Sequence, residues 1–259
     1  MSSVTAVARS FKQPWGGYIK PSSMLVTVLD RSEALYPDEN ISASLTGMAV
    51  EYLTRYKMGS SLSDTFSIAL AGAEIAQIAG IKNAKKTAKT LLHGIAGLDE
   101  KSIINTCKLV TFDVWRRNPM SAMLSHGYDD INPNTATISN IKTMVERSIS
   151  FWNQYGPITA EGFTFEPDGY TDTVDSGDGD FLTNDTLWDF KVSKSKPTSK
   201  YTLQLLMYWI MGQHSGKAEF KDITKLGIYN PRLNTVYTTN IADIPPETIN
   251  AVETDVICY

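Results

Sequence analysis

Two alternating segments on either side of Asn184-Asp185 restrict the fold of this chain more than any other part of its sequence. Residues 177–182 and 187–193 each alternate polar and apolar side chains, which is the period of a β-strand. Asn-Asp is a pair suited to a tight turn between two strands. We therefore expect a β-hairpin closed by a two-residue loop.

The predicted register of this hairpin puts Asp180 opposite Asp189 and Asp178 opposite Lys191, with all four side chains on one face. Opposed carboxylates repel one another unless a cation lies between them. Asp180 and Asp189 are therefore candidate ligands of a hard divalent ion, and without a nearby thiol or imidazole they favour Mg²⁺ or Mn²⁺ over zinc. Lys191 can orient a water nucleophile or neutralise charge on a phosphate. A three-residue loop would shift the register and make Asp178 the alternative ligand.

The apolar residues of the second strand separate this prediction from the alternative of a surface hairpin with solvated charges. Trp188, Phe190 and Val192 point to the face opposite Asp189, and a strand this apolar belongs in a core. A helix over residues 199–212 is expected to follow, since Pro197 precedes it and Gly212 lies near its end. Gln204 and Tyr208 are four residues apart and share one face of that helix.

Three motifs in this order resemble those of the PD-(D/E)XK nuclease superfamily, in its RecB-like branch. The matching residues are Gly177-Asp178-Gly179-Asp180 for G-x-x-D, Asp189-Phe190-Lys191 for D-x-K, and Gln204 with Tyr208 for Q-x-x-x-Y. The resemblance covers about a quarter of the chain when the flanking strands are included. It implies an α/β fold with a restriction-endonuclease-like core, a small mixed sheet flanked by helices. It also implies Mg²⁺-dependent hydrolysis of DNA phosphodiester bonds, with Mn²⁺ as a substitute ion.

The resemblance assigns a role to each motif residue. Asp180 and Asp189 hold the metal together with the main-chain carbonyl of Phe190, and Lys191 positions or activates the attacking water. Gln204 and Tyr208 arrange the site or the DNA backbone. We further expect the pKa of Lys191 to be lowered, because an ammonium group is disfavoured beside a divalent cation in a partly dry cleft.

Glu51 is a further candidate ligand, carried by a predicted helix that starts near Ser44 and ends before Gly59. Residues 47–51, GMAVE, resemble the first motif of the family, G-x-x-x-H, with Glu51 in the place of the histidine. In other branches of the superfamily a helix glutamate contributes to the metal site. The alternative is a solvated glutamate that pairs with Arg55 four residues further on.

The remaining sequence is expected to form a mainly helical part over residues 1–155, which packs on the core and contributes its first helix, and a nuclease core over residues 156–259. Trp15 is a candidate for stacking on nucleic acid, with a packed arm as the alternative. Glu161, on a predicted strand before the hairpin, is a secondary site candidate. A lysine cluster is a candidate for phosphate contact, with a solvated helix face as the alternative; it comprises Lys82, Lys85, Lys86 and Lys89.

Composition limits the partners. The net charge is −4, so the chain lacks the global basic character of a protein that coats DNA, although basic groups can still line one cleft. Two cysteines rule out the four-cysteine iron-sulfur cluster of some RecB-like nucleases. With no signal segment and no long apolar run, we expect a cytoplasmic protein that does not enter a membrane. No ATP-binding motif is present, so a motor would be a partner such as a helicase or another recombination protein.

Other functional classes stay open from the sequence. One is a non-catalytic DNA-binding or assembly module that shares the fold, and another is a metal-dependent hydrolase of RNA or of nucleotides. The nuclease interpretation fits recombination, repair or defence in a bacterium or phage.

Overall fold

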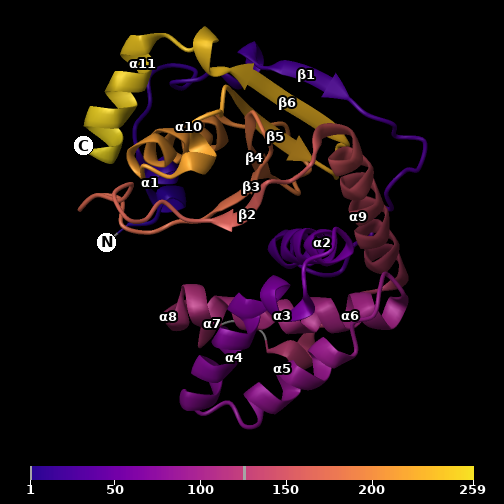
Figure 1. Ribbon diagram of the computed structural model, residues 1–259. Coiled ribbons are helices and arrows are strands. Elements are labelled where there is room, and N and C mark those ends of the chain that lie inside the picture. Colours follow the sequence, from indigo (N-terminus) through magenta and orange to yellow (C-terminus); the bar gives the residue numbers. More distant parts are fainter. Residues whose placement is uncertain (1, 125–126) are drawn as a thin grey trace. The chain divides into compact units, whose positions relative to one another are not determined.

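The computed structural model describes residues 2–124 and 127–259, and it divides into two compact units (Figure 1). Unit 1 comprises Met1–Asp30 and Phe151–Tyr259, and unit 2 comprises Arg31–Ser150. This division differs from the boundary expected at residue 155, because the first thirty residues belong with the sheet and not with the helical part. Each unit is described by itself.

Unit 1 is built on a six-stranded mixed sheet with the order β1-β6-β5-β4-β3-β2. Every neighbouring pair is antiparallel except β4 and β5, which are parallel. A parallel pair needs a crossover connection, and the helix α10 provides it (Figure 1). The strands are β1 (Leu25–Val28), β2 (Ala160–Phe163), β3 (Gly179–Leu182), β4 (Thr186–Phe190), β5 (Lys225–Asn230) and β6 (Thr235–Asn240). The expected small mixed sheet flanked by helices is therefore present.

The hairpin of β3 and β4 has the predicted register. Phe181 pairs with Trp188 and Leu182 pairs with Leu187, which leaves Asn184-Asp185 as the two-residue loop. The Thr183 amide donates to the Thr186 carbonyl at 3.0 Å and closes the turn. The prediction from strand alternation and turn chemistry is thus confirmed.

One face of the sheet is covered by aromatic side chains from the end of α9 (Thr135–Tyr155). Phe151 stacks on Tyr229 of β5 with ring centroids 3.9 Å apart, and its ring also meets Trp188 of β4 edge-on. Trp152 packs against Phe181 of β3. The apolar set of the predicted hairpin therefore faces a core, as its alternation indicated.

The other face of the sheet packs against α10 (Ser199–His214), which is flanked in turn by α1 (Val4–Ser10) (Figure 1). Leucines of β4 and β5 and the apolar side chains of α10 form one buried cluster there. Burying a Leu side chain contributes about 1.5–3 kcal/mol. The remaining elements of unit 1 are η1 (Pro21–Ser23), η4 (Ala218–Phe220), η5 (Ile241–Asp243), α11 (Pro246–Ala251) and η6 (Val252–Ile257).

Unit 2 is helical. Its elements are α2 (Ala43–Lys57), α3 (Leu62–Thr65), α4 (Ser67–Ile78), α5 (Ala84–His93), α6 (Glu100–Leu109), η2 (Val110–Phe112), α7 (Asp113–Arg117), α8 (Pro119–Ala122), η3 (Tyr128–Asp130) and the first part of α9. The side chains of Ser42 and Asp99 cap α2 and α6 by accepting main-chain N–H groups of the first turn. Gly72 allows α4 to approach η2, since a Cβ there would lie 1.9 Å from the Phe112 carbonyl oxygen. Among the helices described, none is long and apolar enough to cross a membrane.

Candidate functional site

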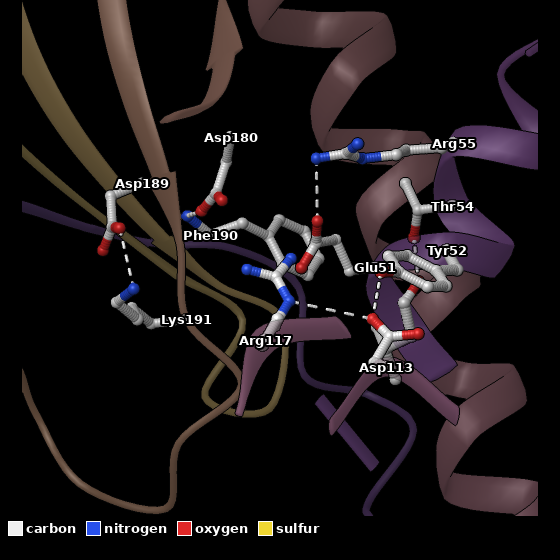
Figure 2. Close-up of polar contacts among 11 residues, drawn as sticks. Glu51, Tyr52, Thr54, Arg55, Asp113, Arg117, Asp180, Asp189, Phe190 and Lys191 are labelled. Atoms are coloured by element: carbon white, nitrogen blue, oxygen red, sulfur yellow. Dashed lines mark hydrogen bonds and ion pairs between the residues drawn. The ribbon is translucent and has the colours of Figure 1, made fainter. Parts of the chain in front are cut away.

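The carboxylate of Asp180 is fixed at the end of the hairpin. Its Oδ2 accepts a hydrogen bond from the main-chain N–H of Phe190 at 2.7 Å, across from β3 to β4 (Figure 2). This bond is charge-assisted and therefore stronger than one between neutral groups. Extending the pairing of Phe181 with Trp188 by one residue puts Asp180 opposite Asp189, and the charge of Asp180 acts on the pKa of Asp189. The two carboxylates are thus neighbours on the face of the sheet that α10 covers.

Asp189 is a buried carboxylate whose one close partner among the described residues is Lys191. Its side chain is 1% exposed, and Lys191 Nζ forms an ion pair with Oδ1 at 2.8 Å (Figure 2). Oδ2 accepts no hydrogen bond from any residue that the structure describes. Buried polar groups are nearly always hydrogen-bonded, because an unsatisfied one costs free energy. Burial raises the pKa of Asp189, Lys191 opposes this, and the negative charge of Asp180 adds to the increase.

Lys191 follows β4 directly and is held at both ends. Its main-chain N–H donates to the Tyr229 carbonyl at 2.9 Å, and its Nζ lies 5.5 Å from the centre of the Tyr201 ring. Burial acts to lower the pKa of Lys191, but Asp189 and Asp180 outweigh it and raise the pKa. The lowered pKa that we expected beside a cation therefore has no support from the protein's own groups. Lys191 is an ammonium ion at neutral pH, suited to orienting and to neutralising charge.

Gln204 and Tyr208 lie on α10 and are both buried. Gln204 Nε2 donates to the Tyr208 hydroxyl oxygen at 2.8 Å. Burial raises the pKa of Tyr208, Lys191 opposes this, and Asp180 and Asp189 raise it further. The pKa of Tyr208 therefore depends on all three charged residues of the cluster. The structure brings together the five side chains of the sequence motifs, which are Asp180, Asp189, Lys191, Gln204 and Tyr208.

The two glycines before Asp180 are required for different physical reasons, one by its backbone conformation and the other by a close contact. Gly177 has a φ of +145°, and a Cβ at Gly179 would lie 2.1 Å from the ring of Phe163 on β2. The Tyr170 hydroxyl donates to the Gly177 carbonyl at 2.6 Å and holds the approach to β3. Because the register is the expected one, Asp178 is not needed as the alternative ligand.

Two other candidates lie away from this cluster or in the other unit. Glu161 on β2 pairs with Phe181, so it lies on the opposite face of the sheet from Asp180. Glu51 lies on α2 of unit 2, where it forms an ion pair with Arg55 at 2.8 Å (Figure 2). This is the pairing that the alternative interpretation predicted, and a role for Glu51 as a metal ligand stays a prediction.

The residues of the cluster fit a hard divalent cation. Two carboxylates and one ammonium leave a net charge of −1 on a largely buried site, and Asp189 has oxygens to offer. Asp180, Asp189 and the Phe190 carbonyl would be the protein ligands. The part of the chain that the structure describes contains no group of three or more His, Cys, Asp or Glu side chains placed to hold a metal. Mg²⁺ suits such a site, because it is usually held by one or two carboxylates and keeps several waters.

Comparisons with protein-family models, with curated proteins and with solved structures returned no match for this chain.

Proposed function

We propose that the protein is a Mg²⁺-dependent nuclease that hydrolyses DNA phosphodiester bonds on a restriction-endonuclease-like core. The observation that carries the proposal is the carboxylate pair of Asp180 and Asp189 beside a single ammonium group, that of Lys191, in which Oδ2 of buried Asp189 has no hydrogen-bond donor among the described residues. A structural carboxylate is normally satisfied by the protein itself, whereas a metal ligand is satisfied by its ion.

The position of the cluster in the sheet supports the proposal. Asp189 and Lys191 lie at the carboxyl end of β4, which is one strand of the parallel pair. In open α/β sheets, ligands bind outside the carboxyl ends of parallel strands. The site lies at the end of the hairpin away from its turn, where β3 supplies the second carboxylate, Asp180. A ligand there contacts side chains of β3, β4 and α10.

The residues divide the chemical work. A bound magnesium ion supplies electrophilic polarisation of the scissile phosphate. Asp180 and Asp189 attract and hold that cation, and the Phe190 N–H keeps the Asp180 carboxylate in place. The Lys191 ammonium orients the attacking water and neutralises charge that develops on the phosphate. Tyr208, oriented by Gln204, directs its hydroxyl group toward the same charged cluster.

A cleavage assay tests the proposal. Linear single-stranded, linear double-stranded and circular DNA, with RNA in parallel, are incubated with the purified protein in Mg²⁺, Mn²⁺ or EDTA. We expect metal-dependent degradation of DNA that falls by about 100-fold or more in Asp189→Ala and in Lys191→Ala. Full activity in either folded variant would sink the assignment, and faster cleavage of RNA would move the substrate to the other nucleic acid.

The ion pair itself favours a second candidate, a non-catalytic module. Lys191 compensates one of the two carboxylates, and such a pair is also suited to the purely structural task of fixing β4 against α10. That function predicts no cleavage and no metal binding, together with a loss of stability when Lys191 is replaced by methionine. A titration with Mn²⁺ distinguishes the two candidates even if the assay lacks a partner protein that cleavage requires.

A further inference from the structure

The loop before the first strand presents a tryptophan to solvent. Pro14 to Gly17 form a turn in which the Gly17 N–H donates to the Pro14 carbonyl at 2.9 Å. Gly16, the third residue of the turn, has a φ of +85°, which a type II turn requires at this position. Trp15 at the tip is 97% exposed. The alternative of a packed arm therefore describes the residues next to Trp15 but not Trp15 itself.

Residues on either side of this turn attach it to the start of α10. Gln13 Nε2 donates to the Ser199 carbonyl at 3.1 Å, and a Cβ at Gly17 would lie 2.4 Å from the Ser199 Cβ. The Thr202 hydroxyl donates to the Ile19 carbonyl at 2.7 Å. The turn is thus held on the first turn of the helix whose Tyr201 ring lies over Lys191. Trp15 therefore belongs to the same end of unit 1 as the carboxylate cluster.

The two segments that meet here are basic in a chain that is acidic overall. Residues 11–29 and 190–218 contain no Asp or Glu, although the chain has 28 of these residues. Apart from Lys191, their exposed lysines next to the turn and the start of α10 are Lys12, Lys20, Lys194, Lys196 and Lys200. None of these five forms an ion pair with a residue that the structure describes. A Cβ at Gly16 would lie 3.3 Å from the Lys20 side chain, so that lysine runs beside Trp15.

Two of the four lysines that the sequence singled out differ from this group. Lys85 on α5 forms an ion pair with Glu74 at 2.7 Å. Lys85 lowers the pKa of Glu74 most, and Lys89 adds a smaller decrease. Part of the charge of the α5 cluster is therefore neutralised within unit 2. The charge beside Trp15 is left for a ligand.

We propose that Trp15 and the lysines around the start of α10, Lys12, Lys20, Lys194, Lys196 and Lys200, form a surface that binds an unpaired DNA strand next to the carboxylate cluster. An exposed indole offers a face on which a base can stack, and this favours a single strand because the bases of a duplex already stack on one another. The lysines contact the phosphates of that strand. This inference rests on the proposed nuclease function for its choice of DNA, and it makes single-stranded DNA or a frayed end the substrate class.

Fluorescence anisotropy tests the surface without any cleavage. A labelled single-stranded oligonucleotide of about 20 nucleotides is titrated with the whole chain in EDTA. Trp15→Ala is expected to weaken binding by about 5- to 100-fold, and Trp15→Phe to retain most of it, because stacking on an aromatic ring contributes this much per base. Ile78→Ala is the matched control, since Ile78 is also highly exposed, at 88%, but lies in unit 2.

The salt dependence tests the lysines. Replacing Lys194, Lys196 and Lys200 together by Ala should lower the slope of log Kd against log salt by about 2, at about 0.7 for each phosphate contact of a single strand. The matched triple variant of Lys82, Lys86 and Lys89 should leave the slope unchanged, and unlabelled duplex should compete less well than single strand. Wild-type affinity in Trp15→Ala, an unchanged slope in the first triple variant, or preference for duplex would each overturn the proposal.

The two proposals fail separately. Asp189→Ala should lose cleavage but bind the oligonucleotide as tightly as the wild type, whereas Trp15→Ala should bind weakly with an intact metal site. If the protein binds the oligonucleotide through Trp15 but cleaves nothing, the strand-binding surface is supported and the nuclease function is refuted. Cleavage with unaltered binding in Trp15→Ala would do the reverse.

Discussion

Each unit of this protein buries an aspartate, and the two aspartates differ in the charges that surround them. Asp113 of unit 2 and Asp189 of unit 1 are each 1% exposed. Asp113 accepts a short hydrogen bond from the Tyr52 hydroxyl and lies 3.9 Å from the Arg117 guanidinium (Figure 2). Asp189 has only the ion pair with Lys191 and a second carboxylate opposite it.

The difference shows what separates a structural carboxylate from a candidate ligand. Around Asp113 the protein supplies a hydroxyl donor and a guanidinium group, both at Oδ2, so one cation balances one carboxylate, although Oδ1 accepts no hydrogen bond from the described residues. Around Asp189 the fold places one ammonium group and a second carboxylate, so one negative charge is left over in a buried site, which raises its free energy. A bound cation removes that penalty. The comparison therefore predicts that variants of the two clusters affect different properties.

The largest effect on stability is expected from the Asp113 cluster. Tyr52→Phe removes the hydroxyl donor and leaves the buried carboxylate without that bond, which should cost about 1.5–3 kcal/mol of unfolding free energy. Urea denaturation measures this cost. Tyr36→Phe is the control, because its side chain is 57% exposed. An unchanged urea midpoint in Tyr52→Phe would show that the bond contributes nothing and would remove the contrast between the clusters.

A smaller effect, of predicted sign, is expected from the pH dependence of stability in EDTA. The pKa of Asp189 is raised in the folded state, so its contribution is favourable below the ordinary range of an Asp carboxyl group and is lost as the pH rises through the raised value. The wild type should therefore lose stability relative to Asp189→Asn as the pH rises from about 4 to about 8.

Asp99 provides the control of opposite sign. Hydrogen bonds from Ser102 lower the pKa of Asp99, so its contribution is present above the ordinary range and is lost as the pH falls. The wild type should therefore gain stability relative to Asp99→Asn as the pH rises. Thermal unfolding across the pH range measures both. A wild type that gains stability over Asp189→Asn with rising pH, in the absence of metal, would show that ionising Asp189 carries no free-energy penalty in the folded state.

Much of unit 1 could be predicted from the sequence because local signals and burial agree there. Strand alternation and Asn184-Asp185 together specified the register of β3 and β4, and that register brought Asp180 opposite Asp189. The helix expected over residues 199–212 is α10, which continues to His214. Gln204 and Tyr208 could be placed on one face because helical spacing determines which residues are neighbours.

Other features depended on contacts between distant segments and could not be predicted in this way. The strand β1 pairs with β6 across most of the chain, so the first thirty residues join the sheet unit against the expected boundary. The pKa of Lys191 depends on how close two carboxylates come, and no spacing rule gives that distance. The contact between the Trp15 turn and the start of α10 could not be predicted either. One weak indication of it was present in the sequence, the absence of Asp and Glu from residues 11–29 and 190–218.

The proposed function requires Asp189, and not Asp113, to bind a divalent cation. Electron paramagnetic resonance of Mn²⁺ measures this directly, as the free-ion signal decreases when the metal binds, and Mg²⁺ added afterwards should restore the signal by competition. We predict saturable binding in the wild type and in Asp113→Asn, and none in Asp189→Asn. Equal Mn²⁺ binding in the wild type and in a folded Asp189→Asn variant, or no binding in either, would contradict the account.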